Sequence, residues 1–243
     1  MAGIRGGPSV KANSVDEGSN LNAKPDGYYE VQRSEVLPFI PEGVAKVLEI
    51  GCAEGNFGFQ LKERGTCEVW GVEFVESAAK RAQRVLDRVL IGDIADLVDQ
   101  LPDDYFDLVV CNDVLEHMVD PFTVLSKLKR CISERGVVVS SIPNIRYYPT
   151  FRDLLFHKNW EYEEFGILDS THLRFFTVRS IRNMYARLGY DVLRHEGISP
   201  MPVRPWKYRL INTILRGQLN DMQYLQFVTV ARPIRATPAP DPA

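Results

Sequence analysis

Glycine and acidic residues gather in one stretch, VLEIGCAEGNFGFQL, at residues 47–61. Its glycines, Gly51, Gly55 and Gly58, allow the backbone to approach a ligand closely. The turn lacks the Lys-Ser/Thr pair of a phosphate-binding P-loop. Its G-x-x-x-G-x-x-G spacing weakens, without excluding, a dinucleotide site, which favours G-x-G-x-x-G. Glu49 lies just before the turn, and an acidic residue there suits a cation such as a sulfonium or an ammonium better than a pyrophosphate.

Further carboxylates stand at the ends of the next predicted strands. Glu73 ends WGVEF and Asp93 ends LIGDI, with Ile94 directly after it. A carboxylate at the end of the second strand can accept hydrogen bonds from both hydroxyls of a ribose. A carboxylate at the end of the third can accept from an adenine amino group, with Ile94 beside the ring. The fourth predicted strand then ends in CNDVLEHMVDP.

The elements that must position these residues alternate regularly between short apolar runs and helical segments. In the proposed helices, Pro121 stands in a first turn, Thr177 or Ser180 is available as an N-cap, and Gly189 stops a helix. Such alternation indicates an α/β protein with a doubly wound, seven-stranded, mostly parallel sheet and helices on both faces. The strands are predicted in VAKVLEIG, CEVWGVEF, RVLIGDI, FDLVVCND, GVVVSSIP, DVLRHEGI and YLQFVTVARP.

The chain divides into one domain with two less ordered ends. Residues 1–26 are predicted to be disordered, residues 27–232 to form the domain, and residues 233–243 to be a disordered Pro/Ala-rich tail. Two segments interrupt the alternation. Residues 144–177, after the fifth strand, are rich in aromatic residues and are predicted to bind the acceptor. Residues 199–222 are predicted to form a lid or a contact in a homodimer.

Composition excludes several classes of protein. The 243 residues carry 29 Lys+Arg against 32 Asp+Glu, a net charge of -3, which offers no electrostatic case for general binding to nucleic acid. Residues 141–217 carry a local excess, twelve Lys/Arg against seven Asp/Glu. The four cysteines show no disulfide or metal-finger spacing, and no apolar run approaches the ~18 residues of a membrane span. We therefore expect a cytoplasmic protein with reduced thiols and no membrane span.

Taken together, E-x-G-x-x-x-G, Glu73, Gly92-Asp93-Ile94 and Asn112-Asp113-Val114-Leu115-Glu116-His117 resemble, in order and spacing, the class I S-adenosylmethionine-dependent methyltransferases. The resemblance covers roughly residues 28–195 and implies a Rossmann-like methyltransferase fold. It implies that Asn112 lies beneath the sulfonium and that Arg33, in a segment resembling the helix that covers the cofactor, binds its carboxylate. The other residues that it implies for the cofactor are Glu49, Gly51, Gly55, Glu73, Asp93 and Ile94.

Methyl transfer to a hydroxyl needs an aligned acceptor and a base, and histidine is the usual choice. His172 is our first candidate, because Asp169 lies three residues before it and can orient the imidazole. His117 is the second, because LEHMVDP resembles a stretch of small-molecule and sugar methyltransferases in which a histidine lies near the methyl group.

The acceptor is predicted to be a sugar or oligosaccharide, because residues 142–177 resemble a segment of methyltransferases encoded with glycosyltransferases in bacterial glycan pathways. The alternatives are an N- or C-methyltransferase of a small metabolite, an NAD-binding oxidoreductase and a non-catalytic partner subunit. A divalent metal such as Mg²⁺ would bind Asp113, Asp169 and Glu163, although no spacing rule supports it. The predicted acceptor residues are Asn144, Arg146, Tyr148, Trp160 and Arg174.

Overall fold

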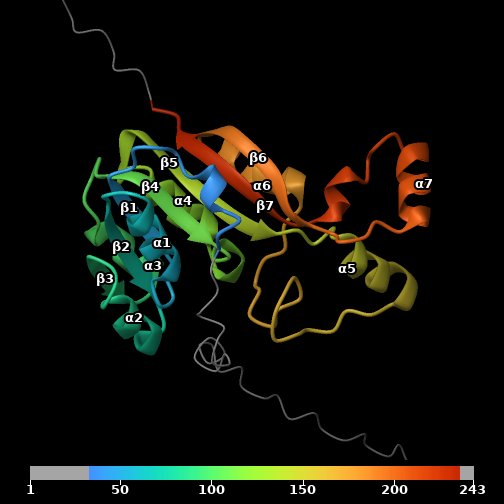
Figure 1. The fold of residues 1–243 in the computed structure, drawn as a ribbon, viewed down its shortest axis with the longest axis horizontal. Coiled ribbons are helices and arrows are strands. Elements are labelled where there is room, and N and C mark those ends of the chain that lie inside the picture. Colours follow the sequence, from blue (N-terminus) through green and yellow to red (C-terminus); the bar gives the residue numbers. More distant parts are fainter. Residues whose placement is uncertain (1–32, 236–243) are drawn as a thin grey trace, which may run out of the picture.

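A seven-stranded sheet forms the centre of the computed structural model, which describes residues 33–235 (Figure 1). The strand order is β3-β2-β1-β4-β5-β7-β6. The first five strands are parallel, and β7 runs antiparallel to both β5 and β6. The predicted fold class is confirmed. The strands are β1 (Lys46–Ile50), β2 (Glu68–Glu73), β3 (Arg88–Ile91), β4 (Phe106–Asn112), β5 (Ile132–Pro143), β6 (Tyr190–Pro200) and β7 (Tyr224–Pro233).

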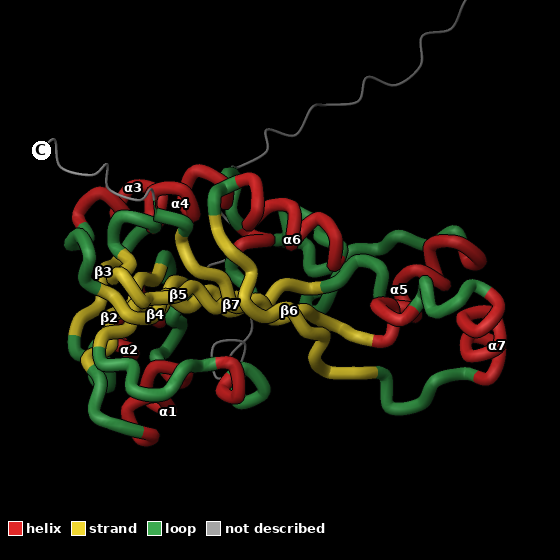
Figure 2. Tube along the Cα trace, turned by 90° about the horizontal axis from the view of Figure 1, so that it is seen from above, coloured by secondary structure: helices red, strands yellow, loops and turns green. Residues whose placement is uncertain are grey.

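Helices cover both faces of the sheet (Figure 2). On one face, Leu125 of α4 and Ile181 of α6 pack into a buried cluster with the sheet. On the other, Phe57 of α1 and Ala82 of α2 join a second buried cluster. Apolar side chains are therefore buried on both sides of the parallel strands, as the continuous apolar runs predict. The helices are α1 (Asn56–Arg64), α2 (Glu76–Ala82), α3 (Ile94–Leu97), α4 (Pro121–Leu128), α5 (Tyr148–Arg152), α6 (Val178–Arg187) and α7 (Trp206–Ile214).

Helix ends follow the local sequence signals. Pro121 occupies the first turn of α4, and the Asp120 side chain accepts hydrogen bonds from two amides of that turn. The sequence left Thr177 and Ser180 as alternative N-caps of α6. Thr177 is the N-cap, and it forms a capping box with Ser180. Gly189 follows this helix with a φ of 73°, a conformation that glycine adopts without strain.

The C-terminal boundary lies further along the chain than predicted. The amide of Ile234 donates to the carbonyl of Gly189 over 2.8 Å. The guanidinium of Arg235 pairs with Asp104 and donates to the carbonyl of Ile132. The domain thus extends at least to Arg235, rather than ending before a tail that begins at residue 233. The segment predicted to be disordered at residues 1–26 lies outside the described residues, as do residues 236–243.

The two predicted interruptions come together in space. Helix α5, the π-helical turn η6 (Asp153–His157) and α7 lie at one end of the molecule, beyond the β6–β7 edge of the sheet (Figures 1 and 2). A small cluster of Met201, Tyr208 and Met222 joins them, with Tyr147 and Tyr148 packed against it. Within residues 33–235, no helix has the length and apolar character needed to cross a membrane.

The capping box at α6 gives a test of the fold. Replacing Thr177 with Ala removes its hydrogen bond to the amide of Ser180, so we expect the free energy of unfolding to fall by about 1 kcal/mol. Urea unfolding measures the change. Ser126→Ala, at an exposed position within α4, is the control and should change stability by less than about 0.5 kcal/mol. Equal stability of both variants and the wild type would contradict the capping role.

Candidate functional site

A cavity of about 1640 Å³ opens where the carboxyl ends of β1, β2 and β4 meet. Residues 49–53 and 72–75 line it from the first two strands, and residues 112–114 and 116–120 line it from the end of β4 onward. Residues 92–95, 165–167 and 169–173 contribute further walls. In doubly wound sheets ligands bind at the carboxyl ends of the strands where the strand order reverses. Here β2 and β3 lie on one side of β1, and β4 and β5 lie on the other. The cavity is therefore the candidate site.

The glycine turn forms one wall of the cavity. Gly51 has a φ of 67°, and a Cβ built there would lie 2.4 Å from Cγ2 of Val114. Gly55 is the N-cap of α1 with a φ of 84°, and a Cβ there would lie 3.3 Å from the backbone of Ala82. Both positions require glycine for conformation and for space. The two glycines thus let the turn pack closely against Val114 and Ala82, and Gly51 lines the cavity whereas Gly55 is not among its lining residues.

Glu49 fixes this turn from below. Its carboxylate is buried and accepts a hydrogen bond from the amide of Gly58 over 3.0 Å. Burial raises the pKa of Glu49 to about 8, and the nearby charge of Glu73 adds to the effect. A Cβ on Gly58 would lie 2.9 Å from Oε2 of Glu49, so the third glycine makes room for this contact. Glu49 holds the turn against α1 as well as lining the cavity.

Glu73 and Asp93 lie at the strand ends where the sequence predicted them. The carboxylate of Glu73 accepts from the amides of Val75 and Ala53, each over 2.8 Å. Burial raises its pKa, while these two hydrogen bonds act in the opposite direction. Asp93 is exposed, caps α3 through the amide of Ala95, and is followed by buried Ile94. All three predicted residues line the cavity.

The side-chain amide of Asn112 has no hydrogen-bond partner among the described residues. Both side-chain polar atoms of this residue are buried in the cavity wall and find no hydrogen-bond partner within residues 33–235. Buried polar atoms normally pair, so an amide of this kind points to a bound polar group. The neighbouring Asp113 accepts from Ser141 and Gln226 and pairs with Arg33. Arg33, predicted to bind the cofactor carboxylate, reaches the cavity but is held there by Asp113.

A cluster of one carboxyl and two imidazoles also lines the cavity. Nε2 of His172 is 3.9 Å from Oε1 of Glu116, and the rings of His117 and His172 have centroids 4.6 Å apart. One ligand atom from each of these three residues lies within 4.8 Å of the others, so the cluster could hold a proton or a metal ion. The sequence prediction included both histidines and missed Glu116.

Hydrogen bonds fix the roles of the two rings. Nδ1 of His172 lies 2.9 Å from the carbonyl oxygen of Ile167, and it must donate because a carbonyl only accepts. In the neutral ring, Nε2 then carries the lone pair on the side of Glu116. Nδ1 of His117 lies 3.1 Å from the carbonyl oxygen of Thr171 and 3.1 Å from its hydroxyl oxygen.

Burial controls the charge of the carboxyl in the cluster. Glu116 is 1% exposed, and burial raises its pKa to about 8, although Arg33 lowers it in part. The carboxylate of Asp169 accepts from the amide and the hydroxyl of Thr171 over 2.8 and 2.7 Å. Asp169 is therefore linked to His117 through Thr171, and its carbonyl oxygen accepts from the amide of His172 at 3.0 Å, so its role in orienting His172 stays a prediction.

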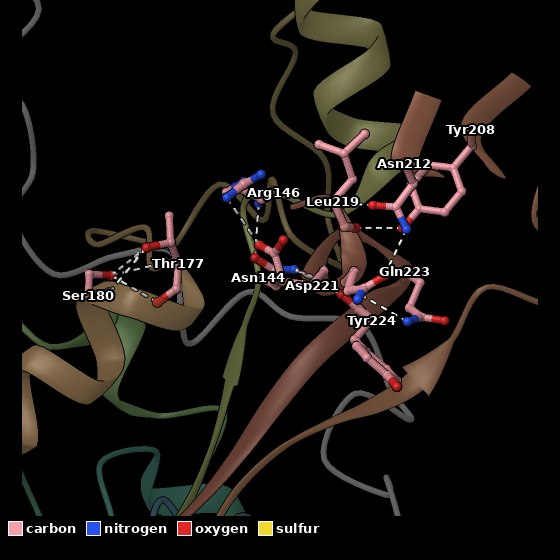
Figure 3. A network of polar contacts seen from close by, with 11 residues as sticks. Asn144, Arg146, Thr177, Ser180, Tyr208, Asn212, Leu219, Asp221, Gln223 and Tyr224 are labelled. Atoms are coloured by element: carbon pink, nitrogen blue, oxygen red, sulfur yellow. Dashed lines mark hydrogen bonds and ion pairs between the residues drawn. The ribbon is translucent and has the colours of Figure 1, made fainter. Parts of the chain in front are cut away.

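The five predicted acceptor residues are not among those that line this cavity. Asn144 is buried and donates to the carbonyls of Asp221 and Tyr224, while its oxygen accepts from the amide of Arg146 (Figure 3). Arg146 pairs with Asp221 over 3.4 Å. Tyr148 packs on Tyr208 with ring centroids 5.1 Å apart. These contacts hold the insertion to α7, so they are structural.

The remaining two acceptor candidates are also engaged elsewhere. Trp160 packs edge-on against Phe175, with ring centroids 5.3 Å apart. The guanidinium of Arg174 donates to the carbonyl of Val119 and lies over the ring of Phe122. The part of the insertion that does line the cavity is residues 165–167 and 169–173. The insertion therefore lines the cavity through its second half, and not through the residues named from the sequence.

The predicted metal ligands do not assemble either. Asp113 is paired with Arg33, and Glu163 is exposed and pairs its backbone with that of Asp169. Within residues 33–235, the group of His, Cys, Asp and Glu side chains that converges is Glu116, His117 and His172. The sequence signal for Glu116 was its place in NDVLEH, directly beside a histidine at a strand end.

Residues 24–195, well over half of the chain, match the family model described as methyltransferase domain. A ubiquinone biosynthesis O-methyltransferase of Idiomarina loihiensis is 33% identical over 106 residues, which cover 41% of this chain and 42% of that protein. The protein of the same name from Pseudomonas syringae pv. tomato is 31% identical over 143 residues, 56% of this chain and 51% of its own length. The chain thus spans about half the length, or less, of these curated relatives.

Solved structures share the fold. A SAM-dependent methyltransferase from Archaeoglobus fulgidus superimposes with a TM-score of 0.65 at 23% sequence identity, covering 84% of this chain and 94% of that one. This likeness concerns the architecture of the sheet and its helices. It agrees with the strand order described above.

The buried carboxyls predict how stability depends on pH. Glu49 and Glu116 each have a pKa raised from the ordinary value of 4.5 to about 8 in the folded protein. Between these two values the folded chain holds protons that the unfolded chain releases, so the free energy of unfolding falls as pH rises. We expect Glu116→Gln to make this decline shallower and to stabilise the protein at pH 8 by about 1–3 kcal/mol.

Urea unfolding between pH 5 and 8 measures this effect. Glu161→Gln, at an exposed position in the insertion, is the control and should leave the slope unchanged. If Glu116→Gln follows the same pH dependence as the wild type, burial does not raise the pKa of Glu116 in the folded protein.

Proposed function

The chain belongs to the methyltransferase domain family, and we propose that it transfers a methyl group from S-adenosylmethionine to a hydroxyl group of an acceptor. The observation that carries this proposal is the cavity, because strand-end acids suited to a nucleoside and the Glu116–His117–His172 cluster line the same space. The family match removes the support for an NAD-binding oxidoreductase. A non-catalytic subunit would have no use for the buried cluster.

The cavity fits the cofactor on its own geometry. Gly51 and the residues that follow it line the cavity with the turn, and the unpartnered amide of Asn112 supplies polar atoms. We assign the ribose to Glu73, and the adenine to Asp93 and Ile94. Arg33 would take the carboxylate after release from Asp113. When bound, S-adenosylmethionine supplies an electrophilic methyl group on a positively charged sulfur.

The Glu116–His117–His172 cluster is suited to accept the proton of the acceptor hydroxyl. The hydrogen bond to Ile167 leaves Nε2 of His172 with its lone pair. Glu116, on the same side of the ring, stabilises the imidazolium when its carboxyl is ionised. We therefore propose His172 as the general base and Glu116 as its charged partner. His117 and Asp169, linked through Thr171, hold the loop that carries His172.

The acceptor is proposed to carry an aromatic hydroxyl. The wall near the cluster includes Met118, Phe165, Ile167 and Leu173, which suit a flat apolar ring. The relatives named ubiquinone biosynthesis O-methyltransferases support O-methylation. The saccharide predicted from the sequence loses its support, because the residues chosen to stack on a sugar lie outside the cavity wall.

Turnover with a panel of acceptors tests the function. The protein is incubated with methyl-labelled S-adenosylmethionine and with catechols, simple phenols, mono- and oligosaccharides, and amines, and products are detected by mass spectrometry. We expect methylation of a phenolic hydroxyl. Methylation of a sugar would support the saccharide acceptor predicted from the sequence, and N-methylation alone would contradict a hydroxyl acceptor.

A parallel assay in the presence of a chelator tests for a metal. We expect turnover without added metal, whereas activity that is lost in chelator and restored by a divalent ion would indicate that the Glu116–His117–His172 cluster binds a metal.

Glu73→Ala tests the cofactor site. The loss of a buried carboxylate that pairs with two hydroxyls should raise the dissociation constant of S-adenosylhomocysteine by roughly ten- to a hundredfold. Isothermal titration calorimetry measures it, and circular dichroism checks that the variant is folded. Glu76→Ala, three residues further on and exposed, is the control. An unchanged constant in the folded Glu73 variant would place the ribose elsewhere.

His172→Ala tests the proton transfer. We expect turnover to fall by about two to four orders of magnitude, the usual contribution of a general base. Affinity for S-adenosylhomocysteine should stay nearly normal, because His172 is not among the residues that we assign to the cofactor. His157→Ala is the matched control, since His157 is exposed and pairs only with Asp153 among the described contacts of its ring. Near-normal turnover of the His172 variant would reject the assignment.

A further inference from the structure

The α5–α7 lobe, residues 147–158 and 201–223, has an internal core of its own. Tyr208 is buried, packs on Tyr148, and donates its hydroxyl to the carbonyl of Leu219 over 2.5 Å. The side chain of Asn212 bridges α7 to the following turn by donating to Asn220 and accepting from the amide of Leu219 (Figure 3). These contacts fix the lobe as a built unit attached to the sheet through Asn144 and Asp221.

The outer side of the same lobe is apolar. Trp206, Leu210 and Ile214 are spaced one helical turn apart on α7 and are 69%, 53% and 70% exposed. In the neighbouring turn η6, Phe156 is 70% exposed. Neighbouring exposed apolar positions of one lobe form a patch of the kind that marks an interaction surface. The further exposed apolar side chains of the lobe are Leu154, Leu155, Val203, Ile211 and Leu215.

The same lobe is rich in exposed basic residues. Residues 201–219 contain no acidic residue. In α5 and η6, Asp153 is already paired with Arg152, and Asp221 near the base of the lobe pairs with Arg146. The chain as a whole is acidic, with a net charge of -3, so the lobe is a basic exception. The exposed basic residues of the lobe are Arg152, Lys158, Arg204, Lys207, Arg209 and Arg216.

We propose that the α5–α7 lobe docks the protein onto a membrane surface that contains anionic lipids. A helix with an apolar side, a Trp and flanking Lys/Arg binds in the interface of a bilayer, where apolar side chains enter the acyl boundary and cations meet headgroups. Trp206 suits that boundary because its indole has both an apolar body and a polar N–H. Long side chains such as Lys207 extend to the headgroups while their stems stay in apolar surroundings.

A second copy of the chain is a poorer occupant than a bilayer. In a two-fold symmetric contact the same patch faces itself, so the basic residues of one lobe would lie against those of the other. Like charges brought together in this way oppose association. An anionic surface has the complementary sign. The proposal replaces the earlier alternatives of a lid or a homodimer contact for residues 199–222.

Vesicle binding of the full chain tests the proposal. Binding is measured by co-sedimentation with vesicles of phosphatidylcholine mixed with phosphatidylglycerol and with vesicles of phosphatidylcholine alone. We expect binding to the mixed vesicles, weakened by salt, with a blue shift of Trp206 fluorescence that Trp206→Phe abolishes. The triple variant Trp206→Ser, Leu210→Ser, Ile214→Ser and the charge variant Lys207→Glu, Arg209→Glu, Arg216→Glu should each bind at least about tenfold more weakly.

Matched controls separate the lobe from the rest of the surface. Leu193→Ser changes an exposed apolar residue of β6, and Lys80→Glu changes an exposed cation of α2; both should bind like the wild type. Circular dichroism and affinity for S-adenosylhomocysteine check folding. Failure of the wild type to bind mixed vesicles overturns the proposal, as does equal binding by the triple variant. A dimer in light scattering that the triple variant converts to monomer, without vesicle binding, would assign the patch to a second copy.

Discussion

The parallel pairing of β1 with β2 on one side and with β4 on the other is the constraint on which the site depends. It brings the carboxyl ends of three strands to one point, and the loops that follow them must diverge there. Glu73, Asn112 and the glycine turn at Gly51 come from different parts of the chain, yet each directly follows or ends one of these strands. The cavity is a product of strand order, and the side chains in it decide what it binds.

Burial gives this cavity its chemistry. The site holds Glu49, Glu73 and Glu116 out of water, and in each case burial raises the pKa of the carboxyl. A buried carboxyl costs stability when it ionises, and a cationic ligand or a protonated histidine offsets that cost. The same arrangement therefore weakens the empty protein as pH rises and favours a cofactor that carries positive charge. Stability and function are linked here through three glutamates.

The sequence predicted the fold and the cofactor side well, because both depend on local patterns. Apolar runs, glycines at positive φ and acids at strand ends are read within a few residues, and Gly51, Glu73 and Asp93 all line the cavity as expected. The acceptor side depended on how a long insertion folds. Tyr147 and Tyr148 pack against the cluster of Tyr208 in α7, whose sequence lies some sixty residues further on, and no local pattern shows such a pairing. Glu116 was missed because a residue beside a histidine gives no sign, in sequence, of how deeply it is buried.

The central claim is that the cavity at the ends of β1, β2 and β4 binds S-adenosylmethionine with its sulfur between Asn112 and the Glu116–His172 cluster. A crystal structure with S-adenosylhomocysteine tests it most directly. The account predicts the ribose on Glu73, the adenine beside Ile94, the amino-acid part over Gly51, and the sulfur on the side of the cavity where Nε2 of His172 can reach an acceptor. A ligand bound outside this cavity, or one whose sulfur points away from His172, would contradict the account.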